Sequence, residues 1–244
     1  MNDYADGAAI PVPPRPQTGP PLLALALSYA ALTLVGLVLG AGLTRPDDTP
    51  AEVARTLVAQ QITTTLLGAA VIGAAFPLAI WTATAYRRLR QLGVTAPGSA
   101  IALAGGLLAS TMLALSGLVA WTAATSAPAS TPEVLQALST LSFAAGGPGF
   151  VPFSALLVAG VAVPGLNLGL LPRTWAWAGL AIAALSLLSL LSLLTPVLYP
   201  LLPVGRFGGV IWLIAVSVLL PHAPPGRGSS PHAHESPRPT TRNT

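Results

Sequence analysis

Long stretches without a charged residue constrain this chain more than any other feature. Residues 21–43 and 99–123 contain no Asp, Glu, Lys, Arg or His. A helix of about 20 apolar residues, rising about 1.5 Å per residue, crosses the hydrocarbon core of a bilayer. Only 7% of the chain is charged and its mean hydropathy is +0.72, whereas soluble domains carry about 25% charged residues. The sequence therefore predicts an all-α, polytopic transmembrane bundle.

The apolar stretches predict about six spans, at residues 21–43, 62–86, 99–123, 149–171, 175–198 and 201–221. The last reaches full length only if it starts near Leu201 and the side chain of Arg206 extends outward to the interface. Between the third and fourth spans, Thr131 and Pro132 predict the start of a short helix. That helix is expected to end near Ala144, before Gly146, Gly147 and Pro148.

These spans define three regions of the 244-residue chain. A transmembrane helical domain covers residues 21–221, between a Pro-rich tail at 1–20 and a tail at 222–244 that is rich in Pro, Ser, Thr and His. Because neither tail has the apolar period of a packed helix, both are predicted to be disordered. The first apolar run is longer than the core of a signal peptide, so we expect it to stay as a membrane anchor.

The distribution of arginine predicts the orientation. With six spans, one side of the membrane holds Arg15, Arg87, Arg88, Arg90, Arg173, Arg227, Arg238 and Arg242, and the other holds only Arg45, Arg55 and Arg206. Basic residues favour the cytoplasmic side. We therefore expect a plasma-membrane protein with both termini in the cytoplasm. The arginines are scattered between apolar spans rather than gathered on one face, which argues against nucleic acid as a partner.

Two loops on the predicted outer side begin alike, at residues 49–53 (TPAEV) and 131–134 (TPEV). The spans that follow them each carry a glycine four residues before a proline, at 73–77 and 160–164. Such a parallel is typical of duplicated helical hairpins. Thr-Pro-Glu is also a common helix start, and Gly and Pro are frequent in membrane helices, so independent origins stay open.

The predicted spans contain no residue set that is typical of catalysis or metal binding. They hold no Asp, Glu, His or Lys, which argues against proton pumping through buried carboxylates and against an intramembrane protease. The sequence thus predicts no catalytic residue, no metal ligand and no cofactor.

Weaker candidates for a polar site remain. Asn167 follows Pro164 in the fourth span and is the one candidate for substrate binding, although such an amide more often cross-links two helices. Small polar residues recur every three positions in the fifth span, at Ser186, Ser189, Ser192 and Thr195. They could line a pore, but close helix packing is the commoner use. Two further groups are better explained as a solvated loop and as tail composition, namely Asp47, Asp48 and Glu52, and His222, His232 and His234.

Three short segments carry a resemblance to a known group of proteins. They are residues 141–150 (LSFAAGGPGF), 171–173 (LPR) and 205–213 (GRFGGVIWL). With them the chain resembles actinobacterial six-helix integral membrane proteins that form a family of unknown function. The likeness covers mainly residues 130–221. It implies a six-helix membrane protein and supplies no catalytic residues.

The first functional hypothesis is a non-enzymatic membrane protein that acts through contacts with lipid or with unidentified membrane proteins. The alternative is a small transporter or facilitator subunit for a neutral or apolar solute. A third hypothesis, an enzyme with its site at the outer loops, would require Asp47, Asp48 and Glu52 as its acids.

The predicted topology can be tested with reporter fusions. Alkaline phosphatase and a fluorescent protein, each fused in turn to residue 1 and to residue 244, should report the cytoplasm at both ends, because an even number of spans returns the chain to its starting side. Opposite signals at the two ends would contradict the six-span count.

Overall fold

The computed structural model describes residues 20–44 and 47–221. The predicted tail at 222–244, and all of the predicted tail at 1–20 except Pro20, lie outside these residues. All regular structure in the described part of the chain is helical. Six of its helical segments are long and apolar enough to cross a membrane, as the sequence predicted.

The long helices are α1 (Leu22–Gly40), α3 (Gln61–Gln91), α4 (Gly98–Ser126), α6 (Phe150–Asn167), α7 (Arg173–Leu188) and α8 (Leu201–Leu219). Two shorter helices, α2 (Pro50–Ala59) and α5 (Pro132–Ala144), follow the connections after α1 and α4. Single helical turns complete the chain, at η1 (Ala127–Ala129), η2 (Ala145–Gly149), η3 (Ser189–Leu193) and η4 (Pro196–Leu198). The last long helix begins at Leu201, the start that a full-length span required.

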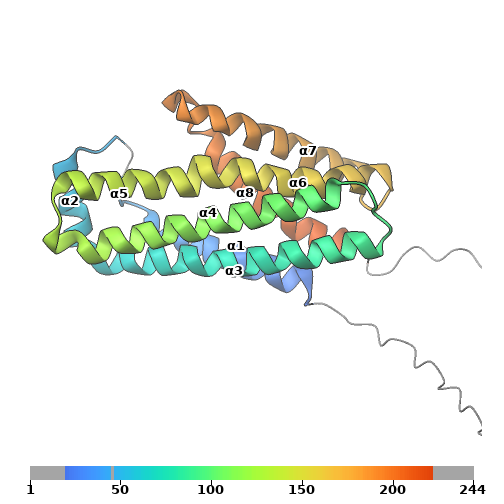
Figure 1. Cartoon of the computed structure of the whole chain (residues 1–244), viewed down its shortest axis with the longest axis horizontal. Coiled ribbons are helices and arrows are strands. Elements are labelled where there is room, and N and C mark those ends of the chain that lie inside the picture. Colours follow the sequence, from blue (N-terminus) through green and yellow to red (C-terminus); the bar gives the residue numbers. More distant parts are fainter. Residues whose placement is uncertain (1–19, 45–46, 222–244) are drawn as a thin grey trace, which may run out of the picture.

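The long helices pack side by side in a closed ring. Helix α3 lies between α1 and α4, α4 contacts α6, and α6 contacts α7. Helix α8 packs on α7 and α6 and closes the ring against α1. Figure 1 shows that α1 begins and α8 ends at the end of the bundle where α3 passes into α4. This arrangement is that of an even number of crossings.

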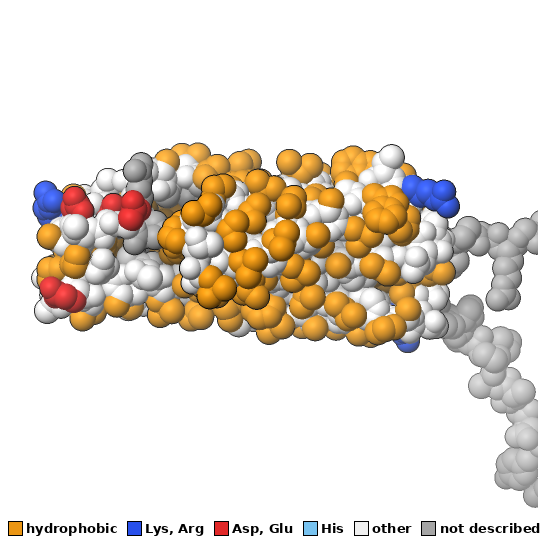
Figure 2. Space-filling view, turned by 90° about the horizontal axis from the view of Figure 1, so that it is seen from above, with side chains coloured by type: hydrophobic (Ala, Val, Ile, Leu, Met, Phe, Trp, Pro, Cys, Tyr) orange, Lys and Arg blue, Asp and Glu red, His pale blue; other side chains and the backbone are white. Residues whose placement is uncertain are grey.

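The two ends of the bundle differ in length and charge. Helix α2 and the first part of α5 extend past the turn between α7 and α8 (Figure 1). They enclose a small separate core with the end of α4, formed by Val53, Leu57, Ala123, Ala127 and Leu135. We call this region, residues 47–59 with η1 and α5, the cap. Acidic side chains gather at this end of the molecule in Figure 2, and the acidic residues of the cap are Asp47, Asp48, Glu52 and Glu133.

The opposite end carries basic side chains, and we call it the basic end. It holds Arg87, Arg88 and Arg90 in the last turns of α3, and Arg173 at the start of α7. Between the two ends, the outer surface of the helices is largely hydrophobic (Figure 2). Leu27 and Val38 of α1 and Phe76 of α3 are among the large apolar side chains exposed there. Such a surface suits lipid rather than water.

The start of α2 is fixed by a capping box. The Thr49 backbone N–H donates to Glu52 Oε2 over 2.9 Å, and the Thr49 hydroxyl accepts from the Glu52 N–H over 3.4 Å. The Thr49 hydroxyl also donates to the same carboxylate. These hydrogen bonds from Thr49 hold the pKa of Glu52 below its ordinary value. The carboxylate is thus engaged by its own helix.

The α-helix α5 ends at Ala144, as predicted, but Gly146, Gly147 and Pro148 do not interrupt the helical path of the chain. The chain continues from α5 through the π-helical turn η2 into α6, so that residues 132–167 form one helical segment. Pro148 cannot donate a hydrogen bond, and its ring would clash with a preceding carbonyl in a regular α-helix. One wider turn accommodates it without ending the helix.

Glycines allow α4 to approach two neighbours closely. A Cβ added at Gly117 would lie 2.7 Å from the Gly68 carbonyl oxygen of α3, and one added at Gly160 of α6 would lie 2.5 Å from the Ala102 nitrogen of α4. Gly106 of α4 lies against the Thr82 side chain of α3, whereas Gly36 of α1 has only side-chain atoms of α3 nearby. Gly169 has a positive φ of 64° in the turn after α6.

We expect Gly117→Ala to destabilise the bundle by about 1–3 kcal/mol, because the added methyl group forces the α3 and α4 backbones apart. The matched control is Gly73→Ala, whose added Cβ would meet only a Leu32 methyl at 3.6 Å. Thermal unfolding in one detergent should show a lower midpoint for Gly117→Ala alone. Equal midpoints for the two variants would contradict the close contact.

Candidate functional site

A cavity of about 390 Å³ lies inside the bundle, in the half nearer the cap. Helix α1 supplies one wall, and α3 and α4 supply another. The remaining wall comes from α5, η2 and the start of α8. The lining of the cavity is mostly aliphatic, as at Leu37, Leu67 and Val71. The cavity reaches Leu57 of the cap core. A volume of this size falls in the range of about 300–1,000 Å³ that small-molecule sites occupy.

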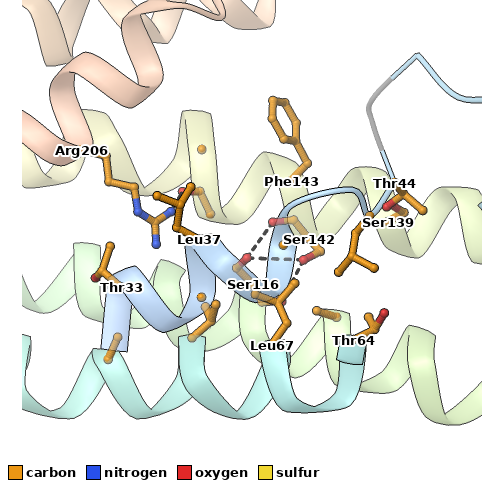
Figure 3. A pocket seen from close by; sticks show the side chains of 18 of the residues that line it. Thr33, Leu37, Thr44, Thr64, Leu67, Ser116, Ser139, Ser142, Phe143 and Arg206 are labelled. Carbon is orange, nitrogen blue, oxygen red and sulfur yellow. Dashed lines mark hydrogen bonds between the residues drawn. The ribbon is translucent and has the colours of Figure 1, made fainter. Parts of the chain in front are cut away.

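Polar side chains occupy distinct parts of this lining. The Ser116 hydroxyl donates to the Ser142 carbonyl oxygen over 2.8 Å, and the Ser142 hydroxyl donates to the Ser116 carbonyl oxygen over 3.0 Å. These reciprocal hydrogen bonds join α4 to the last turns of α5 (Figure 3). Nearer the cap, the hydroxyls of Thr44 and Ser139 lie 2.8 Å apart and connect the residues after α1 to α5.

Arg206 is the one charged side chain among the described residues that line the cavity. One of its terminal nitrogens, Nη1, donates to the Gly146 carbonyl oxygen of η2 over 3.1 Å. Its guanidinium carbon lies 5.2 Å from the centre of the Phe150 ring, which is a cation–π contact. The sequence led us to expect that this side chain extends outward from the first turns of α8. Instead it reaches across the interior toward Thr33 and Leu37 of α1 (Figure 3).

The π-helical turn provides the acceptor for Arg206. Gly146 lies against Ser116 of α4, where an added Cβ would be 2.5 Å from the serine hydroxyl oxygen. Glycine at this position therefore lets α4 and η2 meet beside the cavity. The same region is fixed on its other side by Phe143, whose ring makes an edge-to-face contact with Tyr199 at 5.3 Å.

The half of the bundle nearer the basic end is filled by large side chains. Trp81 and Trp212 are 1% and 0% exposed. The Trp81 indole N–H donates to the Ser217 hydroxyl over 2.8 Å, and that of Trp212 donates to the Trp175 carbonyl oxygen over 2.8 Å. Neither tryptophan lines the cavity. The two buried tryptophans thus belong to packed core outside the cavity lining, and each is held by a hydrogen bond to another helix.

Asn167, the candidate from the sequence, lies away from the cavity. It is the last residue of α6, is exposed, and belongs to the basic end rather than to the interior. The turn that follows it contains Gly169. Its position at a helix end gives it access to water and to lipid headgroups, and the cavity lining does not include it.

The other polar groups singled out in the sequence are also elsewhere. Ser186, Ser189 and Ser192 are buried beside α8 and do not line the cavity. An added Cβ at Gly205 of α8 would lie 2.6 Å from the Ser186 hydroxyl, which shows their use in close packing. Within residues 20–44 and 47–221, no three His, Cys, Asp or Glu residues are grouped as metal ligands. His222, His232 and His234 lie outside the described residues.

Sequence reasoning missed Thr33, Ser116, Ser139 and Ser142 as cavity residues. Each is a hydroxyl in a helix of mostly apolar residues, and such hydroxyls usually bond to the preceding turn of their own helix. Arg206 was the one cavity residue that the sequence could indicate, because it is a charge inside an apolar span.

Comparisons with protein-family models, curated proteins and solved structures give no match to this chain.

The absence of cysteine makes the access to the cavity directly measurable. We expect Ser142→Cys to react with a small membrane-impermeant methanethiosulfonate added on the cap side, because Ser142 is half-buried and lines the cavity. Ser189→Cys is the matched control, since Ser189 is 0% exposed and lies outside the lining. Mass spectrometry would count the adducts, and equal labelling of the two variants would contradict the proposed access.

Proposed function

We propose that this chain is a non-enzymatic plasma-membrane protein that binds an amphiphile in the cavity beside Arg206. The carrying observation is a mostly aliphatic cavity with one charged side chain in its described lining, within a helical bundle whose outer face is largely hydrophobic in Figure 2. Of the two kinds of contact that the sequence suggested, lipid and protein, the cavity supports lipid. An amphiphile matches it because one molecule brings both a hydrocarbon part and a polar group.

The lining supports this ligand class in two ways. Leu37, Leu67 and Val71 offer apolar surface from two helices, and burying a hydrocarbon chain there removes about 25 cal/mol of unfavourable hydration per Å². The charged group, by contrast, lies at η2, where Arg206 donates to the Gly146 carbonyl beside the Ser116–Ser142 pair, while the hydroxyls of Thr44 and Ser139 lie nearer the cap. A ligand with separate polar and apolar parts can satisfy both regions at once.

The closed half of the bundle favours binding over passage. A facilitator for a neutral solute needs a path between the two ends, and that path would cross the layer containing Trp81 and Trp212. Both indoles are buried and hydrogen-bonded to other helices. Opening such a layer would require the coordinated separation of α3, α7 and α8. Retention of a ligand requires no such movement.

The distribution of charge supports the orientation in which the cap faces away from the cytoplasm. The basic end holds Arg87, Arg88, Arg90 and Arg173, whereas Arg55 is the described arginine of the cap. Positive residues are retained preferentially on the cytoplasmic side. In this orientation the cavity lies in the outer half of the membrane and continues toward the cap. An amphiphile of the outer leaflet would thus have the shortest route to it.

Filling the cavity should abolish ligand binding. We expect Leu67→Trp to lose lipid adducts in native mass spectrometry, because the indole would occupy the space between α1 and α3. Leu66→Trp is the matched control, since Leu66 lies one residue away on α3 and is 53% exposed to the surrounding lipid. The wild type and Leu66→Trp should carry the same adducts after purification in the same detergent.

Two results would contradict the proposed function. One is an identical number of retained lipids in wild type, Leu66→Trp and Leu67→Trp, which would place lipid on the outer surface only. The other is a flux of a neutral solute into proteoliposomes that Leu67→Trp blocks and Leu66→Trp does not, which would identify a facilitator. A thermal unfolding midpoint for each variant ensures that folded proteins are compared.

A further inference from the structure

The charge and geometry of Arg206 identify the class of ligand more closely. We propose that the amphiphile bound in the cavity is anionic, and that its phosphate or carboxylate oxygens accept hydrogen bonds from the Arg206 guanidinium. This inference rests on the proposed function, because it assigns the polar part of the same ligand. It commits to a molecule that carries its oxyanion on a hydrocarbon tail.

The guanidinium has donors left for such a ligand. Arginine carries five N–H donors, and the interaction with Gly146 is the one hydrogen bond that Arg206 makes within the described residues. Its other nitrogens have no hydrogen-bond partner among the described residues, and they are not buried. They therefore face open space. Figure 3 shows the group directed into the cavity, toward Thr33 and Leu37.

The surroundings of Arg206 lack a counter-charge. No carboxylate of the described residues lines the cavity, and the acidic residues Asp47, Asp48, Glu52 and Glu133 belong to the cap. A cation in a low-dielectric interior is costly unless a charged partner offsets its lost hydration. Such arginines mark binding sites in membrane proteins for this reason. An anion supplied by the ligand would provide the partner that the chain does not.

The guanidinium is also held in a fixed orientation. The Gly146 carbonyl accepts from one terminal nitrogen, and the guanidinium carbon lies over the Phe150 ring, 5.2 Å from its centre. A planar fork restrained in this way can form two parallel hydrogen bonds with an oxyanion, which a flexible ammonium group cannot. The site is therefore organised for a phosphate or carboxylate before the ligand arrives.

A polar side chain also lies on the opposite wall. Thr33 of α1 is 5% exposed and lines the cavity, but its hydroxyl oxygen is buried, so the side chain would have to rotate to reach the headgroup. Figure 3 places it beside the Arg206 guanidinium. The apolar lining beyond it, at Leu67 and Val71, favours a ligand with a tail over a free hydrated anion.

The test compares anionic and zwitterionic lipids of equal chain length. The full-length protein, reconstituted in equimolar dioleoyl-phosphatidylglycerol and dioleoyl-phosphatidylcholine, is released into native mass spectrometry and its retained lipids are counted. We expect about a tenfold preference for phosphatidylglycerol in the wild type, as for one charge-assisted pair. Arg206→Gln should bring the ratio near one. Arg173→Gln, which removes the same charge from an exposed site at the basic end, should keep the wild-type ratio.

A second variant tests the charge without removing the arginine. Leu37→Glu places a carboxylate on the wall that Arg206 faces (Figure 3), so an internal ion pair should displace the lipid anion and lower the ratio. Leu37→Gln, of the same shape and without the charge, should retain the preference. This pair of variants answers the question even where Arg206→Gln fails to fold.

Each outcome separates the inference from the proposed function. Equal retention of both lipids by the wild type, with both lost in Leu67→Trp, would overturn the anionic ligand and leave amphiphile binding intact. A preference for the anionic lipid that persists in Arg206→Gln or in Leu37→Glu would also overturn the anionic ligand.

Inorganic phosphate alone serves as the small-anion probe. A rise in the wild-type unfolding midpoint that Arg206→Gln abolishes would indicate a soluble anion instead, whereas no rise supports the amphiphile.

Discussion

The hydrogen bonding of the backbone in the absence of water is the constraint on which this structure depends. Inside a bilayer every N–H and C=O must find its partner within the protein. The helices satisfy most of this requirement by themselves, and one place where the described chain departs from a regular α-helix is residues 145–149, which form a wider turn around Pro148. There the Gly146 carbonyl accepts from Arg206 and the Ser142 carbonyl accepts from Ser116. Irregular backbone is tolerated at this depth because side chains from two other helices complete its hydrogen bonds, and it lies beside a cavity rather than against lipid.

The features that could be predicted from the sequence are those that depend on one segment at a time. The length of each uncharged run sets the number of spans, and the length needed to cross a bilayer sets the start of the last one near Leu201. Helix α5 ends at Ala144 as predicted, but Gly146, Gly147 and Pro148 do not interrupt the helical path, for an instructive reason. These residues stop helices in water, where the freed backbone groups are solvated. In this bundle the alternative to continuing is an unsatisfied backbone in an apolar interior, so the helix continues as a π-turn.

The cavity itself could not be predicted, because its walls come from residues that are far apart in the sequence. Thr33, Ser116, Ser142 and Arg206 belong to four different helices, and nothing in the local pattern of each shows that they face one another. Asn167 was predicted as a candidate for substrate binding because it is an amide near a proline in an apolar stretch. Its depth in the membrane decides its environment, and that depth depends on where α6 ends. Arg206 was identified correctly as the unusual charge, yet its direction depends on an acceptor in η2 sixty residues earlier.

The unequal filling of the two halves is the physical basis on which we propose that this bundle binds rather than conducts. Toward the basic end, Trp81 and Trp212 fill the interior and each indole is hydrogen-bonded, so separating the helices there would leave two buried donors without partners. Toward the cap, glycines at 36, 40, 146 and 147 line the space and no large side chain occupies it. The helices are therefore harder to separate on the side of Arg206 that faces the basic end than on the side that faces the cap. A ligand that enters from the cap side would meet the guanidinium before it meets the tryptophans, and would stop where its charge is neutralised.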